Sequence, residues 1–281
     1  MIRFSGEKER SGWDWADLIL RISVPVLILV LGAGLNKCTS DREERLARQE
    51  RESAVVSGFI GEMQKLIIAN RIVPGKQVSG ESLVLPRELT TSALAQLGAE
   101  DAHQWRSQVL RFVRGLKLIQ KGGGNLLLSA DLSHLNLREA DLREAGLRKA
   151  ELTKANLSLA RLDEADLREA TLMDANLSMA QLRGADLREA EISSANLSKA
   201  YLGGANLGQA NLAEANLIKA ELNGASLNGA KLSGADLSGA NLSRANLSNI
   251  SWTDFTRWPG PASFKGAKNI PPELRKQLGI P

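Results

Sequence analysis

The residues that most often carry catalysis or bind metals are few in this chain of 281 residues, and they stand far apart. Its two histidines, His103 and His134, each stand alone, and Cys38 is its one cysteine. A single cysteine excludes an intramolecular disulfide, and no Cys/His/Asp cluster has the spacing of a metal site. The glycines after Lys121 match neither of the phosphate-binding motifs GxxxxGK(S/T) and GxGxxG. We therefore expect no enzyme, no cofactor and no metal.

Charged side chains are the second candidate for chemistry. Arg168 and Glu169 form a pair that recurs further along the chain as Arg188 and Glu189, and Arg148 stands in line with the two arginines. They are expected on walls open to solvent, where burial cannot tune a pKa for catalysis. They predict an exposed charge grid that either keeps the chain soluble or is recognised by a partner.

These charges belong to a five-residue repeat that runs from residue 130 to residue 249. The stretch holds 24 pentads without an insertion, and the central residue is Leu in 23 of them, with Ile192 as the exception. The residue two positions earlier is Ala in 23, with Leu135 as the exception. Steps of five leave no stripe on an α-helix and break the alternation of a strand. A chain that turns a corner once per pentad fits, so we expect six square coils of four pentads each.

The regular Leu and Ala are expected to fill the interior of every coil. The predicted core comprises Leu142, Leu147, Leu157, Leu167, Leu177, Leu187, Leu197, Leu207, Leu217, Leu237, Ala140, Ala160, Ala180 and Ala200.

A second period, of four pentads, distinguishes the faces of the coils. One face favours Asn and Asp before the central Leu, and these side chains should stack as a hydrogen-bonded polar ladder. The predicted ladder is Asn136, Asn156, Asn176, Asn196, Asn216 and Asp236. The opposite face also favours Asn and Asp, whereas the two faces between them are mixed.

The pentads, written A(D/N)LxX, resemble those of the pentapeptide-repeat family. The resemblance implies a mainly β fold, a right-handed quadrilateral β-helix with these Leu and Ala inside. It covers 120 of the 281 residues. It is specific for the fold and weak for function, because the fold serves many unrelated binding roles.

Composition divides the chain into six expected segments. These are an N-terminal tail (1–17), a transmembrane anchor (18–36), a long charged and amphipathic helix (37–71), a small helical cap region and link (72–129), the repeat (130–249) and a C-terminal cap (250–281). The net charge is +4 overall and −3 in the repeat, which carries 13 Lys or Arg and 16 Asp or Glu. The C-terminal cap carries five Lys or Arg and two Asp or Glu.

The membrane anchor is predicted from the apolar run 18–35. The run is just long enough to span a bilayer, and Trp13 and Trp15 precede it as interfacial anchors do. The excess of Lys and Arg after the run predicts a single-pass membrane protein whose repeat lies in the cytoplasm. This arrangement looks like membrane-anchored pentapeptide-repeat proteins of bacteria.

Three further segments leave alternatives open. The apolar face of the long helix, which includes Phe59 and Met63, either packs on its neighbouring region or forms a self-association seam. Two short helices are predicted at Glu88–Leu97 and Asp101–Arg114, and basic residues in the second leave a DNA-reading helix-turn-helix open. Aromatic residues after Asn249 predict a hydrophobic cap or a dimer contact.

The favoured function is a non-catalytic, membrane-tethered scaffold that binds an unknown protein partner. One alternative is a DNA mimic that regulates a DNA-binding enzyme such as gyrase, as some members of the pentapeptide-repeat family do. The modest charge of the repeat argues against it. The other alternative is a DNA-binding or enzymatic role of 72–129. Nucleic acid is not the expected partner, and a homo-oligomer through 40–70 or the C-terminal cap remains possible.

Overall fold

The chain folds into two compact units, Met1–Arg51 and Glu52–Pro281. The computed structural model describes residues 41–67, 69, 83–97, 103–115, 118–119 and 126–280. In the first unit the described residues, 41–51, are helical and exposed. The second unit holds a small helical region and the repeat.

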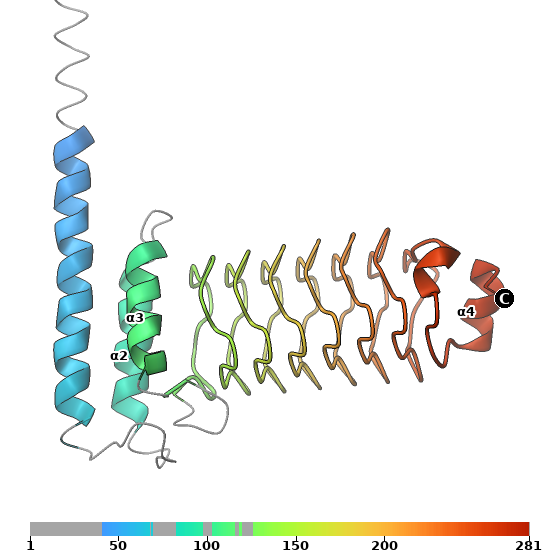
Figure 1. Ribbon diagram of the computed structural model, residues 1–281, viewed down its shortest axis with the longest axis horizontal. Coiled ribbons are helices and arrows are strands. Elements are labelled where there is room, and N and C mark those ends of the chain that lie inside the picture. The colour runs from blue at the N-terminus through green and yellow to red at the C-terminus, as the bar shows by residue number, and fades with distance from the viewer. Residues whose placement is uncertain are drawn as a thin grey trace, which may run out of the picture. The chain divides into compact units, whose positions relative to one another are not determined.

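The helical region of the second unit contains residues 52–67, α2 (Val84–Gln96) and α3 (His103–Gly115) (Figure 1). The ring of Phe59 meets the ring of Phe112 edge to face, with centroids 5.8 Å apart. Both side chains belong to or pack against the buried core of this unit. The apolar face predicted for the long helix is therefore covered by the chain's own helices.

The observed helix bounds differ from the predicted ones. α2 begins at Val84, so its first turn contains Pro86, which the predicted start at Glu88 left out. Proline is tolerated in the first helical turn because an N–H there has no acceptor within the helix. α3 is described over His103–Gly115, and its predicted start at Asp101 lies outside the described residues.

Two side chains join these helices to the first coil. Arg87 of α2 donates from Nε to the carbonyl oxygen of Leu126 at 2.9 Å. Arg114 of α3 forms an ion pair with Asp141, with 2.6 Å between Nη1 and Oδ1. The backbone of Ile119 also accepts a hydrogen bond from the N–H of Gly146 at 2.7 Å. The helical region thus covers the first edge of the stack.

The repeat is a stack of coils, each joined to the next on four faces (Figure 1). Parallel bridges link each bridge residue to its counterpart four pentads later, beginning with Asp131 to Glu151 and Asn136 to Asn156. Successive N–H groups donate to carbonyl oxygens of the neighbouring coil, as Leu142 does to Arg161 at 2.8 Å. These bridges confirm the predicted β-helical solenoid.

The interior of the coils is filled by the regular side chains. The central Leu of every pentad, and Ile192 in its place, is at most 1% exposed, and the regular Ala residues are at most 3% exposed. All fourteen predicted core residues lie in this interior. Leu135, which replaces one Ala in the first coil, is partly buried.

Every corner of the stack is made by a residue in the left-handed conformation. The last residue of each pentad, from His134 to Asn249, has φ between 55° and 61°, or between 66° and 72° where it is Gly. This conformation costs a residue other than Gly about 1–2 kcal/mol. The bridges and the filled interior offset that cost, so Glu, Lys and Asp occupy corners freely.

The stack continues past Asn249 into a seventh, irregular coil. Lys231 pairs with Ser251 at the regular step of four pentads, whereas Asp236 pairs with Arg257 and Asn246 with Lys268. One residue is thus inserted before Arg257 and a second before Lys268. The predicted cap, 250–281, therefore begins as another turn of the solenoid.

Aromatic side chains replace Leu in the seventh coil. Trp252 and Trp258 each follow a bridge residue, which is the place of Leu in a pentad, and their rings meet edge to face at 6.4 Å. The turn η3 (Pro261–Phe264) adds Phe264, which is buried. The short helix α4 (Pro272–Leu278) then covers the open end with Leu274, and it stops at Gly279 with φ 62°.

Replacing an interior leucine with a carboxylate tests the interior assignment. Leu187→Asp should destabilise the full chain by on the order of 3 kcal/mol or more, because the buried charge has no partner. The urea midpoint followed by circular dichroism measures this, with the exposed Glu189→Gln as the matched control. Equal midpoints for Leu187→Asp and the parent chain would contradict the assignment.

The corner conformation makes a second prediction, at Lys199, which has φ 58°. Lys199→Val should be less stable than Lys199→Gly by about 1–2 kcal/mol, because a β-branched residue resists the left-handed region. The control is Ser198→Val, at a position where the next coil carries Ile218. If Val costs as much at 198 as at 199 in the same urea titration, the corner assignment is wrong.

Candidate interaction surface

The residues most suited to chemistry are not brought together in the described part of the chain. His134 is an exposed corner residue, and His103 begins α3. Cys38 and Lys121 lie outside the described residues. Within the described ranges, no group of three or more His, Cys, Asp or Glu could hold a metal ion. What this part of the chain presents to other molecules is the outer walls of the coils.

The predicted polar ladder is a row of side chains that cap their own corners. Oδ1 of Asn176 accepts the N–H of Ser178 at 3.1 Å, and Oδ1 of Asn196 accepts that of Ser198 at 3.1 Å. Between successive amides, Nδ2 of Asn196 is 3.5 Å from Oδ1 of Asn176, the limit of a hydrogen bond. Backbone bridges stack the six residues, and their side-chain oxygens mainly accept N–H groups of their own turns.

The arginines of the predicted charge grid mostly bind carboxylates of their own turn. Arg168 holds Asp166 with two parallel bonds, Nε to Oδ1 at 2.7 Å and Nη2 to Oδ2 at 2.7 Å. Arg188 holds Asp186 in the same way, at 2.9 Å and 2.7 Å. A further contact of 3.7 Å joins Arg168 to Asp186 of the next coil. Each fork fixes its corner and neutralises a carboxylate.

Arg148 pairs differently because Gly146 stands where the other turns have Asp. Its guanidinium reaches the next coil and donates from Nε to Oε1 of Glu169 at 2.9 Å. Lys149 approaches the other carboxylate oxygen of Glu169 at 3.3 Å. Glu189, one coil further, is exposed and forms no ion pair with a described residue. Arg148 and Glu169 thus pair across neighbouring coils, whereas the next two arginines form forks within their own turns.

The forks shift the protonation of their members. Hydrogen bonds from Arg143 lower the pKa of Asp141 to about 2, although burial raises it. The charge of Arg114 also lowers this pKa. Burial raises the pKa of Asp186, but hydrogen bonds from Arg188 outweigh it and leave the pKa below its ordinary value. The bond to Asp166 raises the pKa of Arg168. These groups stay ionised and paired, which suits structure rather than proton transfer.

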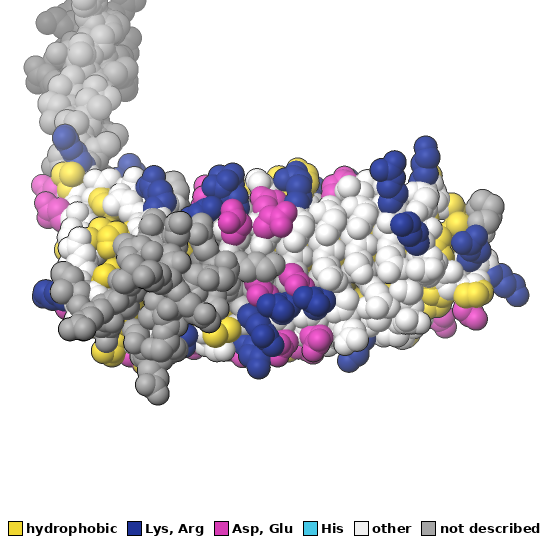
Figure 2. Space-filling view, turned by 60° about the horizontal axis from the view of Figure 1, so that its bottom comes forward, with side chains coloured by type: hydrophobic (Ala, Val, Ile, Leu, Met, Phe, Trp, Pro, Cys, Tyr) yellow, Lys and Arg dark blue, Asp and Glu magenta, His cyan; other side chains and the backbone are white. Residues whose placement is uncertain are grey.

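Charge is unevenly distributed along the stack. Residues 130–190 carry nine Lys or Arg and twelve Asp or Glu, whereas residues 191–249 carry four of each. On the face shown in Figure 2, charged side chains gather over the earlier coils and give way to a largely uncharged wall. Lys and Arg side chains reappear near the C-terminal end. The later coils therefore offer a neutral wall bounded by a basic end.

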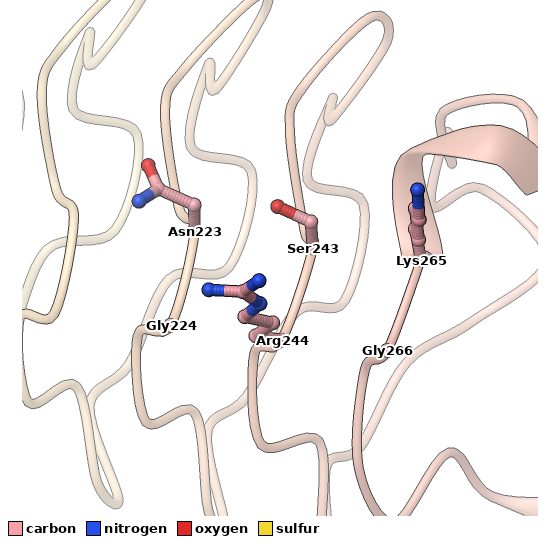
Figure 3. Close-up of a pocket in the computed structure, with 6 residues that line it drawn as sticks. All are labelled: Asn223, Gly224, Ser243, Arg244, Lys265 and Gly266. Carbon is pink, nitrogen blue, oxygen red and sulfur yellow. The ribbon is translucent and has the colours of Figure 1, made fainter.

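A shallow groove of about 450 Å³ lies at this basic end. Its lining comes from the same corner of three successive coils: Asn223, Gly224, Ser243, Arg244, Lys265 and Gly266 (Figure 3). Backbone bonds fix these turns, because Gly224 donates to Ser243 at 2.8 Å and Arg244 to Lys265 at 3.0 Å. Neither Arg244 nor Lys265 forms an ion pair with a described residue. The groove thus joins two available cations to neutral hydrogen-bonding groups.

The sequence did not reveal this groove. The period of four pentads aligns Gly184, Gly204 and Gly224 with Arg244. This alignment is the sequence feature that indicates an open corner beside Arg244. Lys265 lies two positions beyond a step of four pentads from its counterpart Ser243, because of the two insertions in the seventh coil. A count based on pentads ends at Asn249 and cannot place Lys265 beside Arg244.

The residues that build this stack match the family model described as pentapeptide repeats. Eight copies match over residues 127–163, 152–189, 195–234, 210–249 and 220–257. HetL, a pentapeptide repeat protein involved in heterocyst differentiation regulation in the cyanobacterium Nostoc sp. strain PCC 7120, is 34% identical over 50% of this chain and 74% of its own, with a TM-score of 0.30. The chain belongs to the pentapeptide-repeat family.

Two other solved structures are similar to this chain. Rfr23 of the cyanobacterium Cyanothece 51142 is 35% identical over 40% of this chain, with a TM-score of 0.30. The match spans 65% of the length of Rfr23. A trypsin-treated form of QnrB1, a plasmid-mediated fluoroquinolone resistance protein, is 24% identical over 54% of this chain and 84% of its own, with a TM-score of 0.26. No curated protein matches the chain.

The predicted single-pass membrane localisation is corrected. A spanning helix needs about 20 mostly apolar residues. Over the parts of the chain that the structure describes, no helix is both long enough and apolar enough to cross a membrane. The segments 1–17 and 18–36, with the apolar run 18–35, lie outside the described residues. The function proposed below includes no membrane anchor.

The fork at Asp141 predicts how stability depends on pH. Its pKa is lower in the folded chain than the ordinary 3.8, so the ionised form stabilises the fold above about pH 4. That contribution is lost as the pH falls toward about 2. The thermal midpoint of the parent chain should therefore fall more steeply across this range than that of Asp141→Asn. Asn241 accepts the same turn bond in the sixth coil, so the variant should fold. Parallel curves would contradict the prediction.

Proposed function

We propose that this pentapeptide-repeat protein is a non-catalytic scaffold that binds a protein partner on the outer walls of its coils. One observation carries the proposal. The repeated Leu and Ala are buried in the interior, so the pentad positions that vary most lie on the outer walls. A filled interior leaves no internal site for a substrate, and the variable side chains are what a partner can recognise.

The backbone makes such a wall suited to binding. Adjacent coils are spaced like strands in a sheet, about 4.8 Å apart. Each outward side chain is held by a corner with fixed φ and by backbone bridges on both sides. A surface ordered in advance loses little conformational entropy when a partner binds. This supports recognition by shape and by the pattern of side chains.

The arginine forks argue against a DNA mimic. A surface that imitates a nucleic acid must present rows of unpaired carboxylates at phosphate-like spacing. Asp141, Asp166 and Asp186 are instead each held by two bonds from an arginine of the same turn. Their charge is neutralised where a DNA-binding enzyme would need it.

Intramolecular bonds in α3 argue against a DNA-reading helix. Arg106 is buried and donates to the carbonyl oxygen of Leu97. Arg111 donates to its own helix at Ser107, and Arg114 pairs with Asp141. Basic side chains engaged within the chain are poorly placed to contact phosphates or bases.

The scaffold is tested by photo-crosslinking in cells that express the full chain. A photoreactive side chain is placed at Ala213, Ile218, Asn223 or Asn228, the same pentad position on each of the four walls. The proposal predicts a discrete protein adduct that depends on the wall chosen. Unirradiated cells and thermal melts of each variant serve as controls. The same nonspecific crosslinking from all four walls, with no discrete adduct, would contradict the proposal.

A further inference from the structure

We propose that the groove formed by Asn223, Gly224, Ser243, Arg244, Lys265 and Gly266 binds carboxylate side chains of an acidic segment in the protein partner. This inference rests on the proposed scaffold function and names the chemistry of its partner. It concerns residues outside the predicted charge grid.

The two cations of the groove are available for a ligand. Arg143, Arg168 and Arg188 each have an Asp two residues earlier that binds them. Arg244 is itself a corner residue, with φ 59°, and its turn begins with Asn241 instead of Asp. Lys265 extends from the seventh coil beside it, since its carbonyl oxygen accepts the N–H of Arg244 at 3.0 Å.

The carboxylate of Glu221 on this wall is already engaged. Nδ2 of Asn241 donates to Oε2 of Glu221 at 2.8 Å, while Oδ1 of Asn241 accepts the N–H of Ser243 at 3.1 Å. Glu221 is therefore bound along the wall and pairs with neither groove cation. At the far side, Arg257 is paired with Asp236 at 3.2 Å. Arg244 and Lys265 form no ion pair with a described residue and can attract an anion to the groove.

Glycines leave room for the ligand beside the cations. A Cβ added at Gly224, which has φ 70°, would meet no atom within 4 Å. At Gly266 an added Cβ would lie 3.5 Å from Cγ of Arg244, so a side chain there would crowd the guanidinium stem. The side chains of Asn223 and Ser243 line the open space and can donate to a carboxylate oxygen (Figure 3).

Size and charge favour an acidic peptide over a nucleic acid. About 450 Å³ holds one or two side chains, not the backbone of a duplex. A duplex would also meet the adjoining wall, where residues 191–249 carry as many acidic as basic side chains and cannot neutralise a row of phosphates. The cap, with five Lys or Arg against two Asp or Glu, attracts a locally acidic segment instead.

Binding is tested with the purified full chain and a fluorescein-labelled hexaglutamate peptide, followed by fluorescence anisotropy at fixed salt. The charge variant is Arg244→Glu with Lys265→Glu. Glu is tolerated at the corner of Arg244, because Glu139 and Glu144 occupy corners, and Lys265 lies outside the left-handed region with φ −54°. Its control is Lys219→Glu, an exposed corner on another wall with φ 57°. We expect the charge variant to weaken binding at least about tenfold and the control to change it less than about twofold.

A second pair of variants tests the space rather than the charge. Gly224→Asn places a side chain in the groove without changing its charge, and Asn adopts the left-handed region readily. Gly204→Asn makes the same change one coil earlier, where an added Cβ also meets no atom within 4 Å. The first should weaken peptide binding about as much as the charge variant, and the second should leave it unchanged.

Four results would overturn the proposal. One is equal loss in Lys219→Glu or Gly204→Asn, which would make the binding non-local. The second is no binding of the peptide by the folded parent chain. The third is tighter binding of a short DNA duplex than of the peptide, lost in the charge variant. If the photo-crosslinked adduct persists in the charge variant, the scaffold stands and the groove proposal fails.

Discussion

Leucines and alanines fill the interior of the regular coils, with Ile192 in place of one Leu and Leu135 in place of one Ala, and the position of every outward side chain depends on this packing. Each buried Leu contributes about 1.5–3 kcal/mol relative to an exposed one. The chain turns at every fifth residue, so each pentad places one of these leucines inside. The last residue of each pentad then accepts a left-handed conformation that most side chains avoid.

The same packing separates the residues that hold the fold from those that a partner can contact. Asn and Asp at the bridge positions cap their own turns, and arginines two residues later lock the carboxylates in the early coils. Charge in that half is used to hold corners. In the late coils the forks are missing, the wall is neutral, and Arg244 and Lys265 meet at the basic end. Recognition is thus expected where the turns are held without the help of charge.

Much of the solenoid could be predicted because its signals are local and periodic. The pentads place Leu187 inside and Glu189 outside, and the period of four pentads stacks Asn156 on Asn176. The forks could not be predicted from the repeat period. That period brings together residues of neighbouring coils, whereas Asp166 and Arg168 are two positions apart in the same turn. The groove was missed because two insertions move the seventh coil out of register, so no count brings Lys265 to Arg244.

The most direct measurement is a map of amide chemical shifts in the isotope-labelled full chain as the hexaglutamate peptide is added. The account predicts shifts at Gly224, Ser243, Arg244 and Gly266, with little change on the charged wall between residues 141 and 190. Such a result would show that recognition takes place where the charges are not already used by the fold. Shifts confined to residues 141–190 or to α3 would contradict the account.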